Sequence, residues 1–173
     1  MRRLLVAVAV ILSGCSGSGG GKPSGSDAGC VDPGRTVSDE GHGHITDGGS
    51  WPYVSQPPAS GPHAPSPGGY GVYNHPLRRE TYVHNEEHGG VVLLYNCPSG
   101  CPDVLNVFLR LANERTPDQF GEVKVIVTPD PLYDGGLFAA AAWDSVYTPA
   151  TLDEDALRCF IAHHIDQGPE NAP

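Results

Sequence analysis

Hydrophobic positions in the second half of the chain follow two periods, and their succession predicts an α/β fold. Residues 91–95 (Val-Val-Leu-Leu-Tyr) form a continuous apolar run typical of a buried strand, and residues 123–127 (Val-Lys-Val-Ile-Val) alternate as a second strand does. Between them, residues 103–114 carry apolar side chains on one helical face, and Asp103 suits the positive end of the helix dipole. Residues 137–147 predict a further strand, although their alanines also fit a helix.

A second helix is predicted near the C-terminus. Thr151 and Glu154 have the spacing of a capping box, and Gly168-Pro169 provides a stop signal. His163 and His164 fall near its end, where the dipole favours their cationic forms, so we expect them to cap the helix or lie on the surface. The resulting order, β-α-β-β-α in one α/β domain, resembles the C-terminal part of thioredoxin-like domains.

The preceding segment has a different composition. Residues 30–80 hold much of the proline and glycine, so short strands and turns are expected there. Residues 81–83 (Thr-Tyr-Val) are strand formers. We therefore predict a single α/β domain preceded by a Pro/Gly-rich segment of short strands and loops.

The N-terminus has the pattern of an export signal. Arg2 and Arg3 precede the apolar run 4–12, which is shorter than the roughly 20 residues of a membrane-spanning helix. The run ends in Leu-Ser-Gly-Cys and resembles a bacterial lipobox, in which the cysteine, here Cys15, is acylated after cleavage. An ordinary signal peptide with a chance cysteine is the alternative.

This pattern divides the chain into three parts. We expect a lipoprotein signal peptide at residues 1–14, a lipidated cysteine with a flexible Gly/Ser linker at 15–33, and a globular domain at 34–173. The expected location is the bacterial cell envelope, outside the cytoplasm, on the periplasmic or the outer face. Ser16 after the acylated cysteine is permissive for an outer membrane.

The charge balance argues against one class of partner. Without Arg2 and Arg3 the chain has 20 acidic residues against eight basic ones, a net charge of about −12. Nucleic-acid binding relies on Lys and Arg contacts to phosphate, so no nucleic-acid partner is expected. An acidic surface instead concentrates cations. The membrane, reached through the lipid, is the expected partner, and no protein partner is indicated.

Four cysteines remain beside the acylated one, and an even number in an exported protein favours disulfides. Three pairings are possible on paper. We favour Cys97 with Cys101 and Cys30 with Cys159, with reduced Cys97 and Cys101 as the alternative.

Candidate chemistry centres on residues 84–88, His-Asn-Glu-Glu-His. The spacing of His84, Glu87 and His88 matches the inverted zinc-protease pattern, which requires both histidines on one helix face. Strand formers before the motif and Gly89-Gly90 after it leave little room for a helix, so hydrolysis is disfavoured.

A metal site without catalytic turnover fits the residues better. His84 and His88 are joined by His63 and His44, which lie beside glycines and a proline that allow close backbone approach. Imidazole-rich sites suit copper, zinc, iron or nickel, and we expect copper before zinc, with Glu86 and Glu87 orienting the imidazoles. The alternative is a set of scattered polar histidines without a ligand.

Several ordered motifs resemble a bacterial family known as domain of unknown function 3105. They are Pro57-Pro58-x-Ser60-Gly61-Pro62-His63, Gly71-Val72-Tyr73, Val83-His84-x-x-Glu87-His88-Gly89, Thr128-Pro129-x-Pro131, Ala140-x-Ala142-Trp143 and Gln167-Gly168-Pro169-Glu170. The resemblance runs from about residue 34 to the C-terminus and implies an exported or membrane-anchored protein without an established activity. The family's histidine positions correspond to His44, His63, His84 and His88. Members often carry a cysteine where this chain has Tyr70.

A narrower resemblance concerns Cys97-Pro98-Ser99-Gly100-Cys101-Pro102, which looks like the copper-binding loop of Sco-type chaperones. Thiolates at a helix N-terminus are good ligands for soft metals. Three hypotheses follow: an envelope protein that binds, delivers or sequesters a transition metal; a thiol–disulfide protein using Cys97 and Cys101; and a structural envelope lipoprotein without ligand.

Overall fold

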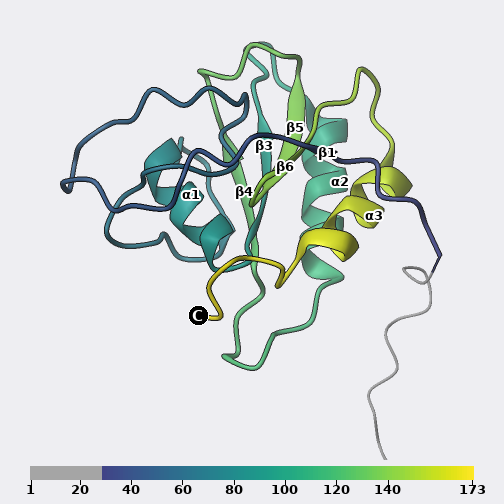
Figure 1. The fold of residues 1–173 in the computed structure, drawn as a ribbon. Helices are drawn as coiled ribbons and strands as arrows, with labels where there is room; N and C mark the ends of the chain where they lie inside the picture. The colour runs from purple at the N-terminus through teal and green to yellow at the C-terminus, as the bar shows by residue number, and fades with distance from the viewer. Residues whose placement is uncertain (1–28) are drawn as a thin grey trace, which may run out of the picture.

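The computed structural model describes residues 29–173, which form one α/β domain with three helices and a single six-stranded sheet (Figure 1). The expected signal peptide, Cys15 and most of the linker lie outside the described residues. Within residues 29–173, no helix is long and apolar enough to cross a membrane. The elements in chain order are β1 (Arg35–Thr36), β2 (Gly71–Val72), α1 (Arg79–Glu87), β3 (Val91–Tyr95), α2 (Pro102–Asn113), β4 (Val125–Pro129), β5 (Phe138–Ala142), β6 (Ser145–Tyr147) and α3 (Glu154–His164).

The sheet has the strand order β1-β6-β5-β3-β4-β2, with β3 near its centre. β3 runs parallel to β4 and antiparallel to β5, so that Leu93 lies opposite Val127 on one side and Ala140 on the other. Every residue of β5 is buried, and its alanines fit between the layers because both faces of the sheet are covered. The predicted strand at 137–147 is thus confirmed as a strand, and a turn at Asp144 divides it into β5 and β6.

The sheet is the middle of three layers. In Figure 1, α2 and α3 lie on one side of it and α1 on the other. Side chains alternate between the faces, so Val91 and Leu93 pack with α2 and α3 whereas Val92 and Leu94 pack with α1. The continuous apolar run of β3 follows from this double burial.

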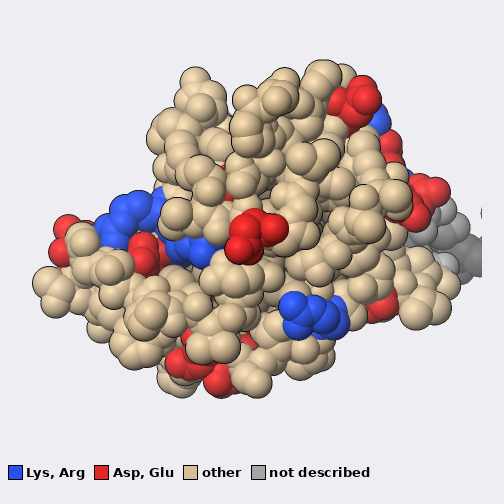
Figure 2. Space-filling model, turned by 90° about the horizontal axis from the view of Figure 1, so that it is seen from above, with Lys and Arg blue, Asp and Glu red and all other residues tan. Residues whose placement is uncertain are grey.

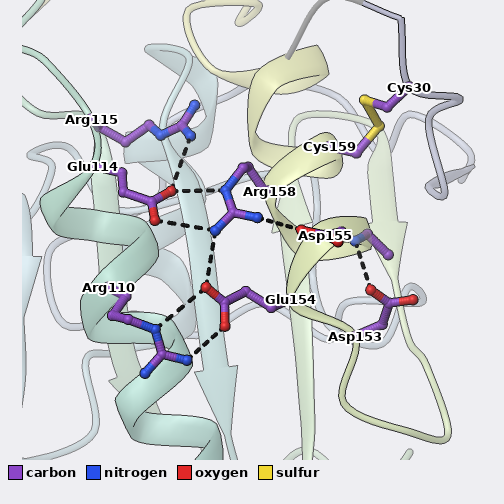
Figure 3. A network of polar contacts seen from close by, with 10 residues as sticks. Cys30, Arg110, Glu114, Arg115, Asp153, Glu154, Asp155, Arg158 and Cys159 are labelled. Carbon is purple, nitrogen blue, oxygen red and sulfur yellow. Dashed lines mark hydrogen bonds and ion pairs between the residues drawn. A yellow bond between two sulfur atoms is a disulfide. The ribbon is translucent and has the colours of Figure 1, made fainter. Parts of the chain in front are cut away.

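A polar network joins the two helices of the first layer (Figure 3). The Arg158 guanidinium on α3 contacts Glu114, which follows α2, and Glu154 and Asp155 on its own helix. Its hydrogen bonds with Glu114 raise the pKa of Arg158 and lower the pKa of Glu114. On the face shown in Figure 2, acidic and basic side chains lie in separate groups, and no continuous acidic patch is visible there.

Two expected helix boundaries are wrong. α3 is capped by Asp153, whose carboxylate accepts a hydrogen bond from the Ala156 N–H, and not by Thr151. It ends at His164, four residues before Gly168, because Ile165 takes an extended conformation and the chain turns toward α1. His164 is also not a cationic surface group: it contacts Asp32 and Ser145, and burial lowers its pKa.

The nine-residue helix α1 departs furthest from the sequence-based expectation. The strand formers Thr81-Tyr82-Val83 lie in the middle of this helix, so the strand preference of these residues is overridden. Seven of the nine residues are buried, so no apolar stripe marks the element in the sequence. Loops supply partners for its polar side chains: Asn85 exchanges two hydrogen bonds with the backbone of Gly68, and Glu80 accepts from the Trp51 N–H.

The favoured cysteine pairing is present. Cys30 is bonded to Cys159 on α3, across 129 residues of sequence, and Cys97 is bonded to Cys101 at the start of α2. The first bridge closes a long loop and attaches the segment before β1 to α3. The second closes a short loop at the end of β3.

Candidate metal centre

The centre is built on the last turn of α1. His84, Glu87 and His88 follow one another at i, i+3 and i+4, so their side chains lie on the same face of the chain. All three are buried, and the Nε2 atoms of His84 and His88 are 3.1 Å apart. The helix therefore supplies the face that the zinc-protease spacing required, although it is followed at once by Gly89 and β3.

The Pro/Gly-rich segment brings two more histidines to this face. Residues 41–45 run parallel to residues 61–63 through a bridge between His44 and His63. The bridge sets the two rings 5.1 Å apart, and the His84 ring lies 5.0 Å from His44 and 4.8 Å from His63. His63 is fully buried whereas His44 is exposed, so His44 forms the solvent side of the cluster.

Backbone carbonyls orient the three buried imidazoles. His63 Nδ1 is 2.8 Å from the Gly61 oxygen, His84 Nδ1 is 2.7 Å from the Ala64 oxygen, and His88 Nδ1 is 2.6 Å from a main-chain oxygen of Pro173. Because a carbonyl oxygen only accepts hydrogen bonds, each Nδ1 carries the proton and donates it. Each neutral ring then has its lone pair on Nε2, the tautomer that ligates metals through Nε2.

The Nε2 atoms face other electron-rich atoms. His84 Nε2 faces His88 Nε2, and His63 Nε2 lies 3.0 Å from a Glu87 carboxylate oxygen without hydrogen-bond geometry. Lone pairs in such contact repel one another unless a proton or a cation lies between them. A cation can satisfy several of these atoms at once, whereas a proton satisfies one pair.

Burial tunes the ionisation of the centre. Burial is the main cause of the lowered pKa values of His63 and His84, and neighbouring imidazoles add to it. Burial also raises the pKa of Glu87, with a further contribution from Glu170. The two histidines are thus held in the neutral form that ligates metals. A nearby positive charge would stabilise the ionised Glu87 carboxylate.

Four ligand atoms lie close enough that small side-chain movements would let them share one ion. His44, His63, His84 and Glu87 each offer one atom, and these atoms lie within 4.8 Å of one another. The structure therefore brings together three of the four predicted histidines, and the fourth, His88, touches His84. Glu87, expected to orient imidazoles from behind, instead stands among the potential ligands, because the backbone carbonyls take the orienting role.

Glu86 is turned away from the centre. It is fully buried, and the neighbours that sense its charge are Tyr53 and Tyr82, with Asp144 acting on it in turn. Neither of its carboxylate oxygens has a hydrogen-bond partner among residues 29–173. Burial therefore raises the pKa of Glu86 well above its ordinary value. The expected orienting role is wrong for this residue.

The C-terminal segment belongs to the site, which the sequence did not predict. The Glu170 N–H donates to the main-chain carbonyl of Glu87, and the Glu170 carboxylate lies 3.6 Å from His88 Nε2. Gly168 packs so closely on α1 that an added Cβ would collide with the main-chain oxygen of Glu87 and the main-chain nitrogen of Gly89. Exposed His42, 4.0 Å from Glu87, is a further neighbour outside the predicted set. The motif Gln167-Gly168-Pro169-Glu170 was the one feature of the sequence that could have pointed to this segment as part of the site.

The sequence profile described as "Protein of unknown function (DUF3105)" matches residues 44–173. The chain belongs to this family. The match spans His44, the helix α1 motif and Glu170, so the whole cluster lies within the family domain. Comparison with curated proteins and with solved structures gives no match. The half-buried Tyr70 donates a hydrogen bond from its hydroxyl to the main-chain carbonyl of Asn85 on α1.

The buried Glu86 carboxyl of this family domain gives a stability prediction. Replacing Glu86→Met removes an unpartnered buried carboxyl and keeps a side chain of similar length. We expect the free energy of unfolding at neutral pH to rise by about 1–3 kcal/mol. Urea titration of the metal-free protein measures this value, and a loss of stability would mean that the carboxyl has a structural role.

Proposed function

We propose that this protein is an extracytoplasmic, lipid-anchored protein that binds a transition-metal ion, copper or zinc. The proposed ligands are His44, His63, His84 and Glu87, with His88 beside them. The observation that carries the proposal is the orientation of the buried imidazoles: backbone carbonyls hold each Nδ1, and Nε2 atoms converge on Glu87 and on one another.

The distances support a metal of this class. Nitrogen ligands bound at 2.0–2.1 Å in a tetrahedral site lie about 3.3 Å apart. His63 Nε2 is 3.0 Å from Glu87, and the four ligand atoms lie within 4.8 Å, so small side-chain movements would complete the site. Three imidazoles and a carboxylate suit zinc or copper(II). Exposed His44 gives the ion a route to solvent, which fits binding, delivery or sequestration.

The anchor and location follow from the signal and lipobox at residues 1–15. Two disulfides suit an oxidising compartment, because thiols are kept reduced in the cytosol. The Gly/Ser linker would let the domain stand off from the membrane. The acidic charge balance would concentrate cations around the centre.

One observation favours a second candidate function, thiol–disulfide exchange. Cys97 and Cys101 lie between β3 and α2, inside a β-α-β unit with parallel strands, which is the context of thioredoxin-like redox motifs. Both cysteines are only half-buried, whereas Cys159 is 4% exposed. The same β-α-β unit, followed by antiparallel β5 and β6, supports a thioredoxin-like assignment of the fold.

Metal content tests the main proposal. We expect wild-type protein dialysed against zinc or copper and then metal-free buffer to retain metal. Glu87→Gln and the double variant His63→Ala, His84→Ala should lose most of it, because each removes ligands from the cluster. Elemental analysis gives the stoichiometry. The matched controls are Glu86→Gln, one residue away but facing elsewhere, and His163→Ala on the surface. Equal retention by the ligand variants would contradict the proposal.

Thermal or urea unfolding gives an independent measure of the same site. A ligand that binds only the folded state stabilises it by about 2.7 kcal/mol at a hundredfold excess over Kd. We expect added zinc or copper to stabilise the wild type and both control variants by this amount, and to leave the stability of the ligand variants unchanged.

Metal retention should also depend on pH with a defined sign. Lowered pKa values keep His63 and His84 neutral below their ordinary value of 6.5, so protons compete with the metal only in more acidic solution. Protonation of Glu87 weakens binding in the same direction. We expect zinc retention to be constant between about pH 8 and 6.5 and to fall as the pH drops further. Constant retention down to about pH 4 would contradict imidazole ligation.

The second candidate predicts selective reduction. If Cys97 and Cys101 exchange disulfides, mild dithiothreitol should release two thiols from the folded protein, because this bridge is the more accessible one. Alkylation followed by mass spectrometry counts them and locates them. The variant Cys97→Ser, Cys101→Ser is the control and should release none. Thiols that appear only after unfolding would identify both bridges as structural.

A further inference from the structure

Glu87 belongs to two groups of potential ligands. The first is the inner group, made up of His44, His63, His84 and Glu87. The second is the outer group of Glu87, His88 and Glu170, whose ligand atoms also lie within 4.8 Å of one another. A single carboxylate shared by two groups has the arrangement of a bridge between two cations.

One ion does not account for all six side chains. Ligands of one ion at 2.0–2.2 Å must lie within about 4.4 Å of one another, which is twice the bond length. His88 and Glu170 do not join the inner group, although His88 Nε2 is only 3.1 Å from His84 Nε2. Neighbouring nitrogens of this kind can belong to two adjacent ions, which lie roughly 3.5–4 Å apart in dinuclear centres.

We propose that the centre binds two divalent cations, bridged by the Glu87 carboxylate, and that His88 and Glu170 hold the outer one. This inference rests on the proposed metal-binding function. The inner cation takes three imidazoles and the bridge. The outer cation takes one imidazole, one terminal carboxylate and the bridge, which leaves positions for water or a partner's ligand.

The electrostatics of the outer group favour a cation. Glu87 and Glu170 each place a carboxylate oxygen in this group, and two carboxylates this close repel one another unless a cation lies between them. The neighbouring basic side chain, Lys124, is engaged by Asp118 and Asp166 and by the His88 and Ala172 carbonyls. Its amine therefore binds the scaffold of the site and leaves the two carboxylates for a metal.

The two positions differ in chemistry and exposure. Two carboxylates and one imidazole form a harder ligand set than three imidazoles and one carboxylate, so the outer position suits zinc or manganese more than copper(I). The Glu170 side chain is 56% exposed, whereas those of His63 and Glu87 are buried. We therefore expect the outer cation to bind more weakly and to exchange faster.

Zinc titration of the full domain tests the proposal. The expected wild-type stoichiometry is two zinc ions per chain, the first tight and the second weaker, measured by isothermal calorimetry and elemental analysis. Glu170→Gln should bind one, because it removes a terminal ligand and keeps the backbone contact with α1. The matched control is Asp134→Asn, an exposed acid outside both groups, which should still bind two.

Cobalt(II) reports whether the two positions share a bridge. We expect the electron paramagnetic resonance signal per cobalt to weaken when the second equivalent is added, because bridged high-spin ions couple, and to stay unchanged in Glu170→Gln. Two uncoupled signals would overturn the bridge. One zinc in wild type and Glu170→Gln alike would overturn the outer site and leave the proposed function standing. No zinc in the wild type would overturn both.

Discussion

The whole centre depends on hydrogen bonds from imidazole Nδ1 atoms to backbone carbonyls. Carbonyls of Gly61 and Ala64 and a main-chain oxygen of Pro173 each hold one ring. A carbonyl has no proton to donate, so this contact selects the tautomer and the orientation together. As a consequence, Nε2 lone pairs meet one another and a carboxylate, and a cation removes that repulsion. Backbone carbonyls thus decide which nitrogen of each imidazole is left free to accept a cation.

These main-chain oxygens come from segments far apart in the chain, so the geometry of the site depends on how these segments pack against α1. Residues 61–64 are attached to α1 by the hydrogen bond from the Ala64 N–H to the main-chain carbonyl of Glu80. The C-terminal segment is held by Lys124, which donates to carbonyls of both His88 and Ala172. Gly168 allows this close approach because a larger residue would collide with the backbone at the end of α1.

Much of the sheet and the helices α2 and α3 were predictable from the hydrophobic pattern of the sequence. The apolar run of β3, the helical face of α2 and the two disulfide pairs were all expected. Helix α1 was not, because it is buried on nearly every side and its polar residues find partners in loops rather than in water. A helix shows an apolar period in the sequence only where one of its faces meets solvent.

The sequence by itself determined which residue types the site has, because the spacing of His84, Glu87 and His88 places two imidazoles and a carboxylate close together. Only the tertiary structure decided the roles. It separated Glu86 from Glu87, although they are neighbours in sequence, because successive helix residues point about 100° apart. It also brought in Glu170, more than 80 residues after Glu87, through a main-chain hydrogen bond to Glu87 that the sequence does not specify. Residue identity sets what a group can ligate, whereas packing sets what it meets.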